Sequence, residues 1–83
     1  MRVFQDENGE RWVASVGERP GDDYKGRFYF HMRPQSGAEE EGVSLIDVRW
    51  NSLETAERTL QTMSVEELRR RLGSARGRVA LLW

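Results

Sequence analysis

Hydrophobic and polar residues alternate with a period of two through much of the first fifty residues, which predicts β-strands. In the clearest case, residues 27–32, Phe28, Phe30 and Met32 share one face of the strand and Tyr29 lies on the other. Three further strands are predicted over residues 2–5, 11–16 and 43–50.

The first two strands are expected to form a hairpin. Asn8-Gly9 lies between them, and both residues tolerate the positive φ that a tight turn requires. A three-residue loop over residues 7–9 would place Phe4 opposite Trp12, a favourable aromatic pair across the strands.

The fourth strand has an imperfect pattern. Ile46 and Val48 alternate in one phase, whereas Val43 and Leu45 alternate in the other. A β-bulge near Leu45, or burial of both faces of the strand, would explain the change of phase.

From residue 53 the apolar spacing changes to that of a helix. Asn51 or Ser52 can cap a helix over residues 53–63, whose apolar stripe contains Leu53 and Leu60. Ser64 and Glu67 form a capping box for a second helix, whose stripe contains Val65, Leu68 and Leu72 and which is expected to end at Gly73.

Strands followed by helices predict one α+β domain over residues 1–83. It has an antiparallel sheet of three to five strands with both helices on one face. The expected core contains Phe28, Phe30, Ile46, Leu53, Leu60, Leu68 and Leu72.

The last five residues, 79–83, alternate again after the helices. Val79, Leu81 and Trp83 would share one face of a strand. Because a bare apolar strand favours aggregation, we expect this segment to dock as an additional strand in its own sheet or in a partner's, with Trp83 at least partly buried.

Composition narrows the class of protein. The chain has no cysteine, which removes disulfides and thiolate chemistry, and its hydrophobic content of 37% and charged content of 33% do not fit a membrane span. We therefore expect a cytoplasmic protein. The preference for arginine over lysine suggests a GC-rich bacterial genome.

No catalytic constellation is recognisable. His31 is the single histidine, no phosphate-binding or nucleophile motif is present, and the runs Asp22-Asp23 and Glu39-Glu40-Glu41 lack the alternating spacing of a calcium loop. We expect a protein that is not an enzyme and needs no cofactor or metal.

Basic residues concentrate at the end of the chain, although the net charge is −1. The candidate anion or nucleic-acid contacts are Arg69, Arg70, Arg71, Arg76 and Arg78. Arg70 and Arg71 have acidic partners four residues earlier, whereas Arg76 and Arg78 have none nearby and are predicted to remain available to an anion.

Two helices can cover only one face of the sheet. The opposite face is expected to present some of Val13, Tyr29, Val43 and Leu45. Loops could cover these residues, or they could form an apolar patch that docks onto a second chain.

The preferred interpretation is a protein-binding or regulatory module whose partner is a protein, including a second copy of itself. Its interaction residues would be Val13, Tyr29, Val43, Leu45, Val79, Leu81 and Trp83. The alternative is a nucleic-acid-binding accessory protein that uses the basic C-terminal third.

Overall fold

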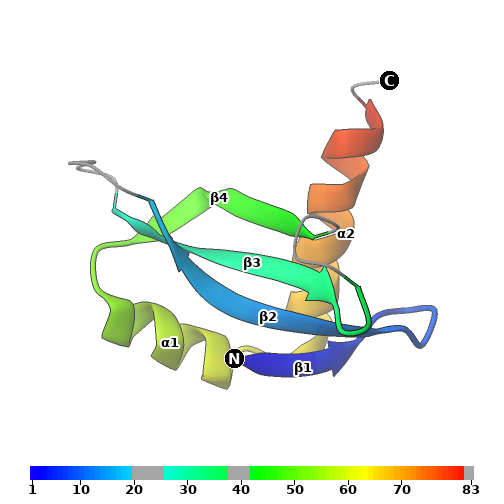
Figure 1. Cartoon of the computed structure of the whole chain (residues 1–83), viewed down its shortest axis with the longest axis horizontal. Helices are drawn as coiled ribbons and strands as arrows, with labels where there is room; N and C mark the ends of the chain where they lie inside the picture. The colour runs from blue at the N-terminus through cyan, green and yellow to red at the C-terminus, as the bar shows by residue number, and fades with distance from the viewer. Residues whose placement is uncertain (20–25, 38–41, 82–83) are drawn as a thin grey trace.

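Four antiparallel strands form one sheet in chain order, β1-β2-β3-β4 (Figure 1). The strands are β1 (Arg2–Gln5), β2 (Arg11–Glu18), β3 (Phe28–Pro34) and β4 (Val43–Trp50). The computed structural model describes residues 1–19, 26–37 and 42–81, apart from the side chains at positions 47 and 77–81. The predicted α+β class with an antiparallel sheet is confirmed.

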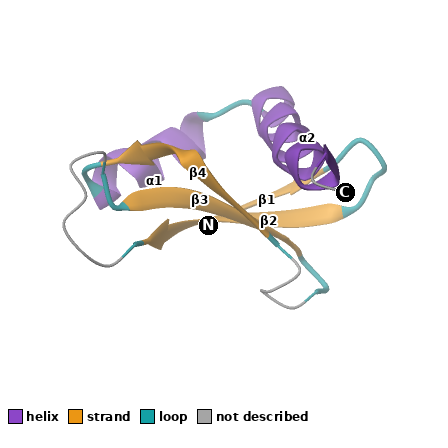
Figure 2. Cartoon of the chain, turned by 90° about the horizontal axis from the view of Figure 1, so that it is seen from above, coloured by secondary structure: helices purple, strands orange, loops and turns teal. Residues whose placement is uncertain are grey.

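Two helices follow the sheet, α1 (Leu53–Thr62) and α2 (Val65–Leu81), and both pack on the same face of it (Figure 2). The predicted caps are present. Ser52 Oγ accepts a hydrogen bond from Thr55 N at 3.4 Å, and Ser64 Oγ accepts one from Glu67 N at 3.1 Å.

The hairpin between β1 and β2 has the expected register, with Phe4 opposite Trp12. Asp6 N donates to Glu10 O at 2.9 Å and Gly9 N donates to Asp6 O at 3.1 Å, so the turn is closed by two backbone bonds. Gly9 has a φ of 83°, a conformation that glycine adopts without the strain a side chain would cause.

The core lies between the sheet and the helices. Phe30, Met32, Leu60 and Leu68 are completely buried, and Trp50 stacks on Phe30 with ring centroids 4.3 Å apart. The helices add Ala56, Leu72 and Ala75 to this cluster. The prediction that Phe28, Phe30, Leu60, Leu68 and Leu72 are buried is confirmed.

The predicted irregularity in β4 is also confirmed, and it changes which residues reach the core. Phe30 pairs with Leu45 and Phe28 pairs with Trp50, so five residue steps along β4 match only two steps along β3. Leu45 is consequently buried in the core, and Val43 packs against it. The prediction that both residues lie on the opposite face is therefore wrong.

Two residues expected in the core are exposed. Ile46 lies in the irregular part of β4 and is 46% exposed, because the strand is out of regular register there. Leu53 is 50% exposed, whereas Ala56 and Leu60, further along α1, are buried. The first turn of α1 therefore leaves its apolar residue in solvent.

The predicted end of the second helix is wrong. Helix α2 continues through Gly73 to Leu81 and projects beyond the sheet (Figure 1). A strand was predicted over residues 79–83, but residues 79–81 belong to the helix. Residues 82–83, including Trp83, lie outside the described residues. Ala75, buried at 5% exposure, extends the apolar contact of α2 past the glycine.

Candidate functional site

The arginines of α2 are held by acceptors within the chain. Arg69 Nε donates to the backbone oxygen of Gln5 at 2.8 Å. Arg70 and Arg71 both bind the carboxylate of Glu67, with Arg71 Nε 2.8 Å from Glu67 Oε2. Arg71 thus has its predicted partner, whereas Arg70 binds Glu67 three residues earlier in the chain.

The charged form of the Glu67 carboxylate is stabilised by Arg70 and Arg71. The hydrogen bond from Arg70 has the largest effect and lowers the pKa of Glu67 below its usual range, and the bond from Arg71 acts in the same direction. Partial burial of Glu67 opposes them. The guanidinium groups of Arg70 and Arg71 therefore both pair with Glu67, an acidic residue of the same helix.

Arg76 is also engaged, contrary to the prediction that it is available to an anion. Its Nη1 lies 3.8 Å from Asp6 Oδ2, and its guanidinium carbon lies 5.2 Å from the centre of the Trp12 ring. These contacts tie α2 to the β1–β2 hairpin. The side chain of Arg78 lies outside the described residues.

Asp6 is the polar centre of this contact and is 8% exposed. Its carboxylate accepts hydrogen bonds from Asn8 N and Glu10 N, each at 2.9 Å, and from Trp12 Nε1 at 3.0 Å. Burial alone would raise the pKa of Asp6. The bond from Trp12, the two backbone bonds and the charge of Arg76 outweigh burial and lower it.

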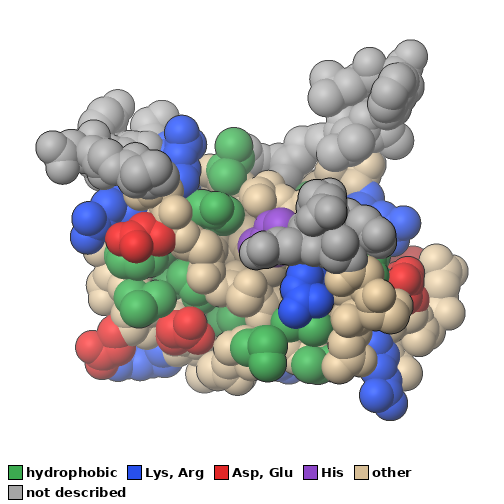
Figure 3. All heavy atoms as spheres, viewed as in Figure 1, with side chains coloured by type: hydrophobic (Ala, Val, Ile, Leu, Met, Phe, Trp, Pro, Cys, Tyr) green, Lys and Arg blue, Asp and Glu red, His purple; other side chains and the backbone are tan. Residues whose placement is uncertain are grey.

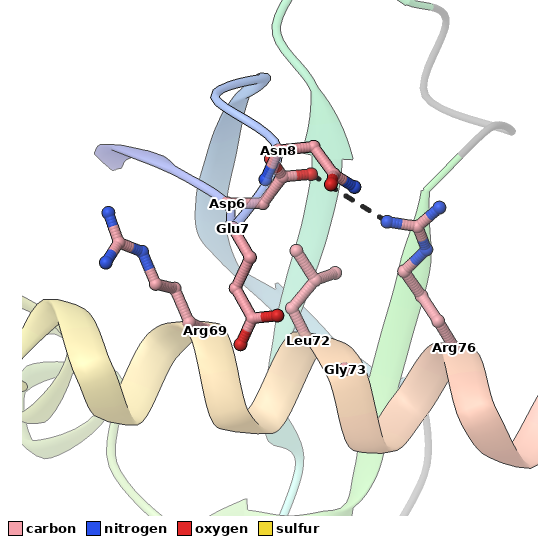
Figure 4. A pocket seen from close by; sticks show the side chains of 7 residues that line it. All are labelled: Asp6, Glu7, Asn8, Arg69, Leu72, Gly73 and Arg76. Carbon is pink, nitrogen blue, oxygen red and sulfur yellow. Dashed lines mark hydrogen bonds and ion pairs between the residues drawn. The ribbon is translucent and has the colours of Figure 1, made fainter.

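A hollow of about 110 Å³ lies between the hairpin turn and α2 (Figure 4). Arg69 and Arg76 contribute positive charge to its lining, and Asp6 and Glu7 contribute negative charge. Since the charges balance and Asp6 already accepts bonds from three donors, the hollow offers no surplus charge to an ion. Gly73, which has no side chain, also lies in its lining.

The described members of the predicted interaction set lie on two different faces of the sheet. Val13 and Tyr29 lie on the face of the sheet opposite the helices, but Val13 is only 4% exposed. Val43 and Leu45 belong to the core side. The side chains of Val79 and Leu81 and the whole of Trp83 lie outside the described residues.

A different set of apolar residues is exposed, and pattern reasoning had placed part of it in the core. Ile46, Val48 and Leu53 are 46%, 44% and 50% exposed. They occur within the short stretch that leads from β4 into α1, and we call them the apolar edge. The phase change in β4 is a sequence signal for the exposure of Ile46 and Val48, and the pattern of α1 gives none for Leu53.

The face of the sheet opposite the helices, which we call the open face, consists of the strand positions that alternate with the core. In β3 these are Tyr29, His31 and Arg33, and in β2 they include Arg11 and Gly17. Figure 3 shows this face, with the histidine near its centre and acidic side chains toward its left and right sides.

His31 contacts a side chain of the neighbouring strand β4. Its Nδ1 lies 3.0 Å from Ser44 Oγ in an exposed position. The described part of the chain contains no group of three or more metal-binding side chains. In the same part of the chain, no helix has the length and apolar character needed to cross a membrane.

No family model matches this chain, and no curated protein or solved structure is detectably similar to it.

Proposed function

We propose that this chain is a non-enzymatic protein-binding module that associates with a second copy of itself through the apolar edge. The observation that carries the proposal is the exposure of Ile46, Val48 and Leu53. Exposed apolar side chains that are neighbours in one segment mark association surfaces more reliably than scattered ones do. The absence of cysteine from the sequence fits a cytoplasmic setting.

The two edges of the sheet differ, which favours β4 as the contact. At β1, the backbone oxygens of Met1 and Gln5 accept hydrogen bonds from Gln61 and Arg69 of the helices. Side chains of the helices thus bind two backbone oxygens at or next to this edge strand. Strand β4 is the opposite edge of the sheet and carries the exposed Ile46 and Val48.

A second copy is the partner that this edge suits. An isologous contact uses the same surface on both chains, so an apolar strip meets an apolar strip. Antiparallel contact centred on Val48 would place Val48 against its own counterpart and Ile46 against Trp50 of the other copy. The strip is short compared with standard interfaces of about 1,200–2,000 Å², so the expected dimer is weak, with a Kd in the micromolar range or above.

The test is the mass of the protein in solution, measured by light scattering after size exclusion over a range of concentrations. The wild type should shift from monomer toward dimer as concentration rises. Val48→Asp should remain a monomer, because two carboxylates would meet at the centre of the contact.

Val3→Asp is the matched control. Val3 is 46% exposed and lies on β1, the opposite edge strand, so this variant should dimerise as the wild type does. A wild type that is monomeric at every concentration would overturn the proposal, and so would equal effects of the two substitutions.

A further inference from the structure

Two arginines of the open face, Arg11 and Arg33, differ from most of the described arginines in the contacts of their side chains. Arg2, Arg58, Arg69, Arg70, Arg71 and Arg76 all donate to or pair with acceptors of the chain. Among the described residues, Arg11, Arg19 and Arg33 have no side-chain hydrogen bond or ion pair. Two of these three, Arg11 and Arg33, occupy strand positions of the open face.

The open face also lacks compensating acids at its described strand positions. β1 contributes Val3 and Gln5, and the positions on β2 and β3 are apolar, small, hydroxyl-bearing or basic. The chain carries a net charge of −1, yet the positions of β1, β2 and β3 on this face include Arg11 and Arg33 and no acidic residue. The sequence places Glu39-Glu40-Glu41 between β3 and β4, outside the described residues, and they are not part of the surface considered.

An aromatic ring lies on the same face of the sheet as Arg11 and Arg33. A side-chain carbon at Gly17 would lie only 2.7 Å from Tyr29 Cζ, so the ring of Tyr29 rests across the bare backbone of β2 at this glycine. Tyr29, His31 and Arg33 follow one another on the same face of β3, about 7 Å apart at each step. A half-buried ring and a guanidinium therefore stand in one row along a central strand.

We propose that the open face binds single-stranded nucleic acid, with Tyr29 stacking on a base and Arg11 and Arg33 contacting phosphates. Single strands are bound by aromatic rings that stack on unpaired bases combined with basic groups that follow the backbone, and the exposed side of a four-stranded sheet is a suitable platform. A duplex is a poorer fit, since this face presents no helix or ribbon that could enter a groove. The residues proposed to bind differ from those of the apolar edge and from the arginines of α2.

The test is fluorescence anisotropy of labelled oligo-dT and oligo-U, titrated with the full chain at several salt concentrations. Two phosphate contacts predict a slope of log K against log salt of about −1.4, at about −0.7 for each contact on a single strand. Arg11→Gln and Arg33→Gln should each reduce the magnitude of this slope by about 0.7. Tyr29→Leu should weaken binding by between about 5-fold and 150-fold.

Arg58→Gln is the matched control, since it removes the same charge from the exposed Glu54–Arg58 pair on the helix side of the sheet. It should leave the affinity within about twofold and the salt slope unchanged. Val48→Asp should also bind normally, so that a failure of the dimer proposal and a failure of this one are distinguishable. Arg11→Gln alters an exposed position and keeps the test valid if Tyr29→Leu fails to fold.

Several results would overturn the inference. One is the absence of binding at low salt, and another is equal weakening by Arg58→Gln and Arg33→Gln. Competition by poly-glutamate as strong as that by the unlabelled oligonucleotide would show an anion-binding surface without preference for bases. Preference for duplex over single strand would contradict the role of Tyr29.

Discussion

Arg76 of α2 lies over the indole ring of Trp12 in β2, with its guanidinium carbon 5.2 Å from the ring centre. The same indole donates its N–H to Asp6 at 3.0 Å, and Arg76 lies 3.8 Å from that carboxylate. The three side chains join the hairpin turn to the part of α2 that leaves the sheet. Removing one of them should therefore affect the other two.

Because of the charge of Asp6, the free energy of unfolding should depend on pH in the acid range. Its pKa is lower in the folded chain than in the unfolded one, so its contribution is complete above the unfolded value of about 3.9 and is lost as pH falls through the folded value. Asp6→Asn should be less stable than the wild type at pH 7, and the difference should shrink toward pH 3. Urea unfolding of both proteins at a series of pH values measures this difference in stability.

Glu7→Gln is the control for this effect. Glu7 lies in the same turn and is exposed. Glu7→Gln should change the free energy of unfolding at pH 7 by no more than about 0.5 kcal/mol. If the difference in unfolding free energy between the wild type and Asp6→Asn does not change with pH, the charge of Asp6 does not contribute to folding.

Arg2 should be important for the end of α1. Its Nη1 donates to the backbone oxygens of Leu60 at 3.1 Å and Gln61 at 3.2 Å, and also to that of Met63. These carbonyls lie in the last turn of α1 or just after it, where partners within the helix are missing. Arg2→Ala should lower the free energy of unfolding by about 1–3 kcal/mol. Arg58→Ala, at an exposed ion pair, should cost less than about 1 kcal/mol in the same denaturation experiment.

Leu60 and Leu53 form a test of the core within one helix. Leu60 is fully buried and Leu53 is 50% exposed. Leu60→Ala should cost about 2–5 kcal/mol of unfolding free energy as a large-to-small change in a packed core. Leu53→Ala should cost less than about 1 kcal/mol. Similar losses in chemical denaturation would show that the side of α1 facing the sheet is misassigned.

Gly73 distinguishes a helix interior from a helix end. A side-chain carbon there would meet nothing within 4 Å, and the helix continues for two turns beyond it. Gly73→Ala should therefore raise the free energy of unfolding by roughly 0.5–1 kcal/mol, since alanine is the better helix former. If Gly73 ended the helix, the substitution would destabilise the protein instead. Thermal unfolding gives the sign directly.

Local signals in the sequence were sufficient for most of the fold. Asn8-Gly9 determined the hairpin and its register, and Ser52 and Ser64 marked both helix starts, because turns and caps depend on residues close in sequence. The end of α2 was missed because glycine often ends helices, although Ala75 continues the spacing of Leu68 and Leu72 and could have indicated the extension.

The surface was harder to predict because it depends on contacts between residues distant in sequence. No pattern indicates that Arg69 binds the backbone of Gln5 or that Arg76 binds Asp6. The basic C-terminal segment therefore looked available, whereas the sparser Arg11 and Arg33 have no partner among the described residues. Alternation within β2 and β3 would have placed these two arginines on one face.

The bonds from Arg2 to Met63 and from Arg69 to Gln5 join residues 61 and 64 positions apart in the chain. During synthesis at roughly 5–20 residues per second, the first hairpin therefore waits several seconds before its partners leave the ribosome. Hairpins form within about 1–10 μs, but Phe4 and Trp12 stay uncovered until α2 exists. A nascent chain stalled before residue 65 would expose this aromatic surface, which is when chaperones would be needed.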